Sequence, residues 1–126
     1  MKILFVYTNI NGFHEDGYAD GIAIMMAVTK KAGHDIRYLR IFEKSDYFLV
    51  NETVKEFMPD VVGFTSVSSQ FSVVTDLADT IKKISPKIIN VCGGVHPTLY
   101  PQCVVENKSL DLVFIGDSEF PFLDYL

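Results

Sequence analysis

Four short polar segments contain most of the side chains that could take part in chemistry. Each follows an apolar run, and they read TNINGFHEDG (8–17), TSVSSQ (65–70), GGVHPT (93–98) and GDSE (116–119). Side chains of these types can bind a polar ligand, transfer a proton or hold a metal. They also fit ordinary hydrated turns, because loops of α/β proteins favour Gly and Ser. Their role depends on whether the fold brings the four segments together.

The first two segments leave several chemistries open. His14 could be a metal ligand, an acid or base, or a solvent-exposed loop residue. The acidic residues beside it and the absence of a Gly/Lys phosphate pattern disfavour a phosphate cradle. In the second segment, Ser68 or Ser69 is expected to cap a helix, and the same hydroxyls can face a polar ligand.

The third and fourth segments place glycines where strands are expected to end. Gly93 and Gly94 would let a flat or bulky ligand approach the backbone without interference from a Cβ atom. His96 fits a hydrogen-bonding loop residue as well as a ligand contact. Asp117 and Ser118 are expected to cap the last helix, since both residue types are common N-caps. No arrangement among these residues supports covalent catalysis, which favours a domain that holds a ligand.

Composition limits the class of protein. The chain has 126 residues, fitting one domain, and 48% hydrophobic residues provide for a core. A net charge of −5 argues against a nucleic-acid partner. Cys92 and Cys103 are too few for a disulfide scaffold, so a cytoplasmic setting is expected. No run reaches the roughly 18 apolar residues of a membrane span.

The elements that position the four segments follow from alternating patterns. Strands are predicted at 2–8, 35–41, 60–66, 87–93 and 111–116, and helices at about 17–32, 49–58, 69–85, 98–107 and from 119 onward. Four strand runs are nearly continuous and the second alternates, as expected of a covered parallel sheet with an edge strand. The pattern predicts an α/β, flavodoxin-like, doubly wound three-layer sandwich with a five-stranded parallel sheet of order 2-1-3-4-5. Its carboxyl edge would bring the polar segments together.

The order of these motifs resembles a known family. The sequence FTSVSSQF…ADTIKKISPKIINVCGGVHPTLYPQCV…LDLVFIGDSEFPFLDYL resembles the amino-terminal cobalamin-binding domain of cobalamin-dependent radical S-adenosylmethionine enzymes. That family combines a Ser/Thr-rich loop, a Gly-Gly-x-His-Pro/Ala-Thr strand exit and a Gly-Glu-Gly-Glu-like turn. The similarity covers nearly the whole chain.

The resemblance implies a role for each matching residue. The Ser/Thr-rich loop would lie beneath the corrin ring, the Gly-Gly-x-His exit would line the groove for the dimethylbenzimidazole nucleotide tail, and the last turn would flank that tail. The corrin-facing residues are then Ser66, Val67, Ser68 and Gln70, and the tail-facing ones are Gly93, Gly94, His96, Gly116 and Asp117. The predicted cofactor-binding set is completed by Asn11, Gly12, His14, Gly17 and Thr65.

Two departures from related patterns concern the first and last loops. Mutase-type cobalamin domains carry Asp-x-His-x-x-Gly, in which the His ligates cobalt from below. Here His14 and Gly17 match and Gly12 replaces the Asp, so His14 is a candidate cobalt ligand without its orienting carboxylate. In the last turn, Ser118 is larger than the usual glycine and would narrow the groove.

The resemblance also implies what lies outside residues 1–126. Cys92 and Cys103 do not form the Cys-x-x-x-Cys-x-x-Cys run of a radical enzyme, so the iron-sulfur cluster and S-adenosylmethionine are expected only in a downstream domain. The chain is thus expected to be a cobalamin-binding, Rossmann-like fragment that is not catalytic alone. Its parent would be a radical S-adenosylmethionine methyltransferase or oxidative cyclase. The expected partners are a corrinoid and the downstream domain, without nucleic acid or membrane.

Two other readings stay open. One is a cofactor-free flavodoxin-like interaction or signalling module, favoured if side chains fill the groove between the third and fourth strand exits. The other is a flavin mononucleotide carrier, which the acidic 8–17 segment disfavours.

Overall fold

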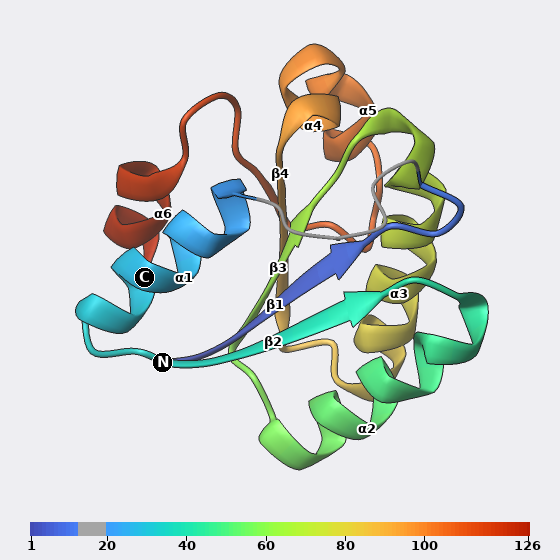
Figure 1. Cartoon of the computed structure of the whole chain (residues 1–126), viewed down its shortest axis with the longest axis horizontal. Helices are drawn as coiled ribbons and strands as arrows, with labels where there is room; N and C mark the ends of the chain where they lie inside the picture. Colours follow the sequence, from blue (N-terminus) through green and yellow to red (C-terminus); the bar gives the residue numbers. More distant parts are fainter. Residues whose placement is uncertain (13–19) are drawn as a thin grey trace.

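The sheet has the predicted strand order. A computed structural model describes residues 1–12 and 20–126. Its five parallel strands lie in the order β2-β1-β3-β4-β5, which confirms the flavodoxin-like prediction (Figure 1). The strands are β1 (Lys2–Thr8), β2 (Asp35–Ile41), β3 (Val61–Thr65), β4 (Ile89–Gly93) and β5 (Leu112–Val113).

Helices cover both faces of the sheet. They are α1 (Asp20–Lys31), α2 (Tyr47–Phe57), α3 (Phe71–Ile84), α4 (Val95–Leu99), α5 (Pro101–Val105) and α6 (Glu119–Tyr125), with 3-10 turns η1 (Lys44–Asp46) and η2 (Ser68–Gln70). Apolar residues of α2, α3 and α5 pack on one face, and those of α1 and α6 pack on the other. Figure 1 shows α1 and α6 together on the side opposite α2 and α3. Within the described ranges, no helix is long and apolar enough to cross a membrane.

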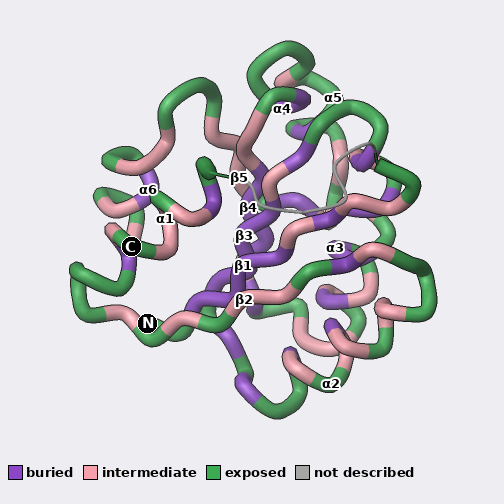
Figure 2. Tube along the Cα trace, in the orientation of Figure 1, coloured by how far each residue is buried: buried purple, intermediate pink, exposed green. Residues whose placement is uncertain are grey.

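The core follows directly from the apolar patterns. The central strands are buried on both faces, as the purple centre of Figure 2 shows. Helix α3 buries Val74, Leu77 and Ile81 against the sheet. Burying each such side chain fully contributes about 1.5–3 kcal/mol. The helix ends at Ser85, whose extended backbone precedes Pro86, because a residue before proline disfavours the helical conformation.

The second strand lies at an edge of the sheet, as its alternating pattern predicted. Arg37 of β2 pairs with Glu56 at 3.0 Å and its guanidinium lies 4.7 Å from the centre of the Phe57 ring. Arg40 lies similarly over Phe42, at 5.0 Å. Charged side chains on an edge strand protect it against pairing with other chains.

Three local predictions were wrong. The predicted 98–107 helix is two short helices, since Pro101 holds Tyr100 at φ −132°, ψ 59°, outside the helical region. The last strand covers only 112–113 rather than 111–116. Neither Ser68 nor Ser69 caps a helix: both lie inside η2, whose N-cap is Val67 without a side-chain hydrogen bond.

Candidate functional site

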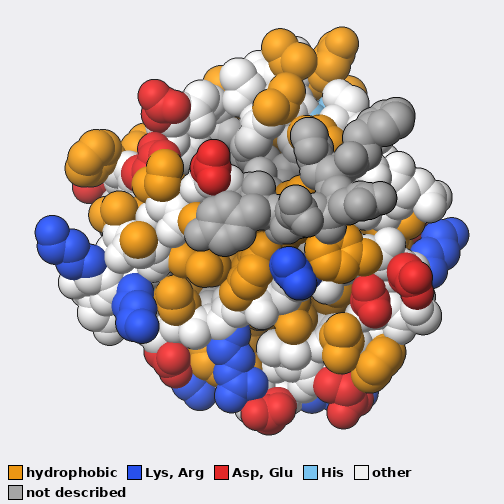
Figure 3. All heavy atoms as spheres, viewed as in Figure 1, with side chains coloured by type: hydrophobic (Ala, Val, Ile, Leu, Met, Phe, Trp, Pro, Cys, Tyr) orange, Lys and Arg blue, Asp and Glu red, His pale blue; other side chains and the backbone are white. Residues whose placement is uncertain are grey.

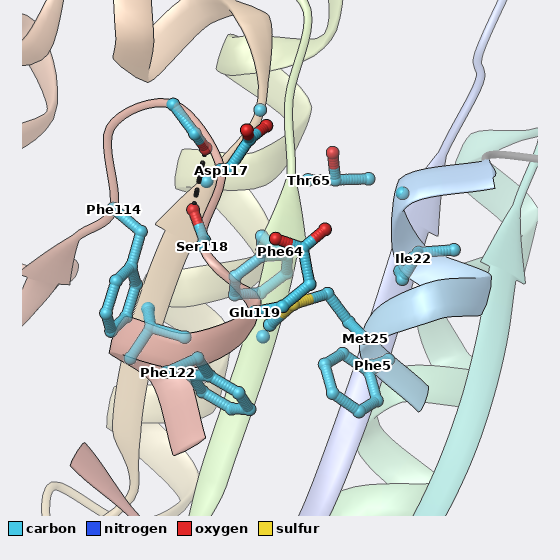
Figure 4. Close-up of a pocket in the computed structure, with 16 residues that line it drawn as sticks. Phe5, Ile22, Met25, Phe64, Thr65, Phe114, Asp117, Ser118, Glu119 and Phe122 are labelled. Atoms are coloured by element: carbon cyan, nitrogen blue, oxygen red, sulfur yellow. Dashed lines mark hydrogen bonds between the residues drawn. The ribbon is translucent and has the colours of Figure 1, made fainter. Parts of the chain in front are cut away.

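A cavity opens beneath the carboxyl edge of the sheet, on the α1/α6 side. Its volume is about 200 Å³. Strands β1, β3 and β4 form its floor, α1 forms one wall, and α6 with the loop before it forms the other (Figure 4). The residues that line it are Phe5, Gly21, Ile22, Met25, Gly63, Phe64, Thr65, Val91, Gly93, Gly94, Phe114, Gly116, Asp117, Ser118, Glu119 and Phe122.

A glycine in the middle of β3 keeps the cavity floor open. Gly63 pairs with Phe5 on β1 and with Val91 on β4. A Cβ atom on Gly63 would lie 3.1 Å from Cδ1 and 3.2 Å from Cε1 of Phe5. Any larger residue would therefore press the Phe5 ring toward the cavity. Thr65 and Gly93 pair two residues farther along, so this floor lies about 7 Å below the strand exits at 3.3 Å per residue.

A second glycine permits the close approach of two strand exits. Gly94 has φ +104°, and a Cβ atom there would lie 2.8 Å from Thr65 Oγ1 and 3.0 Å from the Ser66 backbone N and O. The Ser66 N–H donates to the Gly93 carbonyl at 2.9 Å, and the His96 N–H donates to the Ser66 carbonyl at 2.8 Å. A side chain at position 94 would break this junction at the cavity mouth.

The cavity walls are aromatic and aliphatic. Phe122 of α6 is buried and its ring centre lies 5.9 Å from that of Phe5 and 5.7 Å from that of Phe114. Such aromatic pairs each contribute about 0.5–1.5 kcal/mol beyond area burial. From α1, Ile22 is buried and Met25 is half-buried. The deep part of the cavity is therefore lined by apolar side chains.

Polar groups lie at the rim. Asp117 is exposed and Glu119 begins α6. Ser118 occupies the N-cap position of α6, but its hydroxyl donates to the Gly116 carbonyl at 2.9 Å and caps no helical N–H. The predicted N-cap position of Ser118 is thus confirmed, whereas the predicted side-chain hydrogen bond to the helix is absent. The Gly116 N–H donates to Thr98 Oγ1 at 3.0 Å, which joins this loop to α4.

His96 lies away from the cavity. Its ring stacks on Phe71 with centres 4.3 Å apart, and its Nδ1 lies 2.9 Å from Ser68 Oγ in a hydrogen bond. The side chain is 8% exposed, and its Nε2 has no hydrogen-bond partner among the described residues. His96 thus joins α4 to η2 and is not among the cavity-lining residues that the groove prediction grouped with it.

Gln70 fixes one predicted binding loop against another. Its Oε1 accepts from the Ile10 N–H and its Nε2 donates to the Ile10 carbonyl, both at 2.9 Å. Both ends of the amide are occupied, and the residue is buried. Gln70 therefore positions the loop after β1 beside the loop after β3.

The other predicted residues lie around the strand exits. Ser66 is buried and donates to the Val67 carbonyl at 2.9 Å, whereas Val67 and Ser68 are exposed. Asn11 and Gly12 are exposed after β1, and Asn11 has φ +54°. His14 and Gly17 lie outside the described residues. Of the fourteen predicted positions, the cavity brings together Thr65, Gly93, Gly94, Gly116 and Asp117.

The buried cysteine is unsuited to nucleophilic chemistry. Burial raises the pKa of the Cys92 thiol to about 12. Since the thiolate is the reactive form, this side chain is inert near neutral pH.

Sequence reasoning missed the floor and walls of the cavity. These residues read as ordinary core in the apolar runs: Phe5, Ile22, Met25, Val91, Phe114 and Phe122. Gly63 was the available signal. A glycine inside an otherwise bulky strand marks a place where something approaches the backbone closely.

Known proteins share both the sequence pattern and the fold. The family model described as a B12 binding domain matches residues 9–126. The cytidylyl-2-hydroxyethylphosphonate methyltransferase of Streptomyces wedmorensis is 28% identical over 98% of this chain and 27% of its own length. The anaerobic magnesium-protoporphyrin IX monomethyl ester cyclase of Rubrivivax gelatinosus is 31% identical over 94% of this chain and 23% of its own. The chain thus spans about a quarter of these relatives.

A solved structure agrees in fold. The radical S-adenosylmethionine methyltransferase TsrM of Kitasatospora setae, determined with cobalamin and an iron-sulfur cluster bound, superposes with a TM-score of 0.82 at 17% identity. The match covers 99% of this chain and 26% of TsrM. A likeness at 17% identity shows the fold alone. The family model matches the amino-acid sequence itself over residues 9–126, which include the loops after β1, β3, β4 and β5. This chain belongs to the B12-binding domain family.

Proposed function

We propose that this chain holds a cobalamin at the carboxyl edge of its sheet, with the nucleotide tail entering the cavity between α1 and α6. The observation that carries the proposal is the cavity itself, kept open by Gly63 and bordered at its mouth by Gly94. A cofactor-free module was expected to fill the groove between these strand exits with side chains. The open cavity disfavours that alternative.

The cavity fits the size and polarity of the tail. An apolar cavity of roughly 150 Å³ is large enough to admit benzene. The space of about 200 Å³ here accommodates one bicyclic aromatic base at the apolar floor. The ribose would remain at the polar rim, where Thr65 and Ser118 provide hydroxyls.

The surface above the strand exits suits a large ring with apolar faces. Val67 is 48% exposed in the β3–α3 loop, and Val95 is 56% exposed at the start of α4. Leu99 and Tyr100 are 63% and 54% exposed. Figure 3 shows apolar side chains around α4 and α5 at this end of the molecule. Clustered exposed apolar side chains mark a surface that binds something.

The chain's own residues would hold and orient the corrinoid. The Gln70–Ile10 and Ser68–His96 hydrogen bonds fix the loops that follow β1 and β3, so the ring would meet a preformed surface. When bound, cobalamin supplies a redox-active cobalt centre. His14, which lies outside the described residues, would be a candidate ligand of the cobalt.

The parent protein is proposed to be a radical S-adenosylmethionine methyltransferase or oxidative cyclase. The support comes from the methyltransferase and cyclase relatives, of which this chain corresponds to about a quarter. The iron-sulfur cluster and S-adenosylmethionine would belong to a downstream domain, which would face the bound corrinoid. A cytoplasmic setting is part of the proposal and agrees with the free thiols of Cys92 and Cys103.

The test is a visible-absorption titration with hydroxocobalamin. We expect a saturable spectral change with the parent chain and its loss in Gly94→Trp. Gly33→Trp is the matched control, because Gly33 also has a positive φ, +92°, but lies in the turn between α1 and β2, where a Cβ atom would meet nothing within 4 Å. Circular dichroism would verify that both variants fold. No spectral change with the parent chain, or equal binding by Gly94→Trp, would contradict the proposal.

A further inference from the structure

We propose that the cavity selects among corrinoids by their lower base, accepting a benzimidazole and discriminating against a purine. This inference rests on the proposed function, because it requires the nucleotide tail to enter the cavity. It adds a specificity that family membership does not assign, and it follows from where polar groups lie along the depth of the cavity.

The floor offers no side-chain hydrogen bond to a base. At the level of Phe5, Gly63 and Val91, every lining side chain of the described residues is a hydrocarbon, a thioether or hydrogen. The strands that form this level are paired with one another in the sheet, so their backbone groups are engaged in its ladder. A polar atom of a base placed at this level would be left without a partner.

The polar lining side chains lie at the other end. Thr65 stands two residues beyond Gly63 along β3, at the strand exit. Asp117, Ser118 and Glu119 come from the loop before α6 and its first residue. Figure 4 shows Asp117 and Ser118 near the loop, and Phe5 and Phe122 at the deep end. The cavity therefore changes from polar to apolar with depth.

Polarity rather than size distinguishes the two classes of base. Both are flat bicyclic aromatics, so a cavity that admits one has room for the other. In dimethylbenzimidazole the six-membered ring consists of carbon with two methyl groups. In adenine the same ring carries nitrogens and an amino group, which lose their hydrogen bonds to water at this floor. Burying such groups without partners weakens binding, which predicts discrimination of at least tenfold, about 1.4 kcal/mol.

Met25 is the residue through which this selectivity can be changed. It reaches from α1 toward the α6 side of the cavity (Figure 4), and its thioether sulfur is only a weak hydrogen-bond acceptor. Glutamine has nearly the same length and adds an amide that both donates and accepts. Met26 is a matched neighbour: it also packs on the α1/α6 side of the sheet but is not among the cavity-lining residues.

The experiment compares dissociation constants of three aquo-corrinoids for the 126-residue chain by visible-absorption titration. They are cobalamin, its analogue with adenine as lower base, and cobinamide, which lacks the nucleotide. We expect cobalamin to bind at least tenfold more tightly than the adenine analogue. Met25→Gln is expected to narrow that ratio by about threefold or more, and Met26→Gln to leave it unchanged.

Each of the remaining outcomes would overturn a different statement. Equal binding of cobalamin and the adenine analogue would overturn the proposed selectivity while leaving corrinoid binding intact. Equal binding of all three would show that the tail does not use the cavity, which also overturns the inference. Binding of none of them would overturn the proposed function and, with it, this inference. If Met26→Gln narrowed the ratio of the two dissociation constants as much as Met25→Gln, the role of the cavity floor would be overturned.

Discussion

Filling the cavity floor should separate the stability of the fold from its capacity to bind a ligand. Gly63→Val adds three carbons at the one position of β3 where the sheet faces the cavity without a side chain. The new Cβ would meet the Phe5 ring at 3.1–3.2 Å and Val91 Cγ2 at 3.8 Å. The Phe5 contact is too close, and the ring can relieve it by moving into the adjoining space of about 200 Å³.

The effects on stability nearly cancel. Burying the added carbons contributes about 2 kcal/mol, at about 0.8 kcal/mol per carbon, and removing glycine from a strand interior contributes about 0.5–1 kcal/mol. Overpacking against Phe5 costs about 1–3 kcal/mol. We therefore expect the free energy of unfolding in urea to stay within about 2 kcal/mol of the parent value. A base that can no longer bury about 100 Å² of apolar surface loses about 2.5 kcal/mol, so the dissociation constant for cobalamin should rise more than tenfold.

Val62→Ile provides the contrast within the same strand. Val62 is fully buried and packs in the core cluster on the α2/α3 side, away from the residues that line the cavity. This variant should lose about 1–3 kcal/mol of stability and keep its affinity for cobalamin when folded. Two results would refute the reasoning: unchanged affinity in Gly63→Val, or a loss of stability in Gly63→Val larger than in Val62→Ile.

Two further predictions test local features of the site. Gln70→Leu removes both hydrogen bonds to Ile10, so we expect a loss of about 1–3 kcal/mol in urea unfolding and faster hydrogen exchange at the Ile10 amide; unchanged exchange would show that the amide does not hold the loop. Because burial raises the pKa of Cys92 to about 12, a chromogenic disulfide reagent at pH 8 should modify exposed Cys103 rapidly and Cys92 only on unfolding; two fast thiols per chain would contradict this.

The strands and their order were predictable because they depend on short-range patterns. Five apolar runs separated by helical segments leave few arrangements of a parallel sheet, and the alternating 35–41 run identified its edge. Pro101 alone would have predicted the break in the helix at Tyr100. The apolar residues of 98–107 are only weakly spaced as in a helix, so they gave no separate signal for the two short helices. The N-cap prediction for Ser68 was wrong because its hydroxyl instead hydrogen-bonds His96. That partner is 28 residues away in the sequence, so local propensity could not indicate it.

The candidate site was predictable only at its rim. Gly93 ends β4, while Gly94, Gly116 and Asp117 stand in loops of unusual composition, and the cavity includes all four. The floor consists of residues such as Phe5 that look like any core position. Whether space remains beside them depends on how α1 and α6 pack over the sheet, which no local pattern specifies.

The size of that space argues that it serves a ligand rather than the fold. Cavities left in protein cores destabilise by about 24 cal/mol per Å³, which gives an upper limit of about 5 kcal/mol for one of about 200 Å³ that is partly open at its rim. That is a large share of the roughly 5–15 kcal/mol by which domains are stable. A valine at position 63 would recover part of it, but the overpacking against Phe5 would offset most of that gain. Glycine at the floor is thus close to neutral for the empty domain and becomes favourable once an apolar group occupies the space, because the ligand then supplies the contacts that the missing side chains do not.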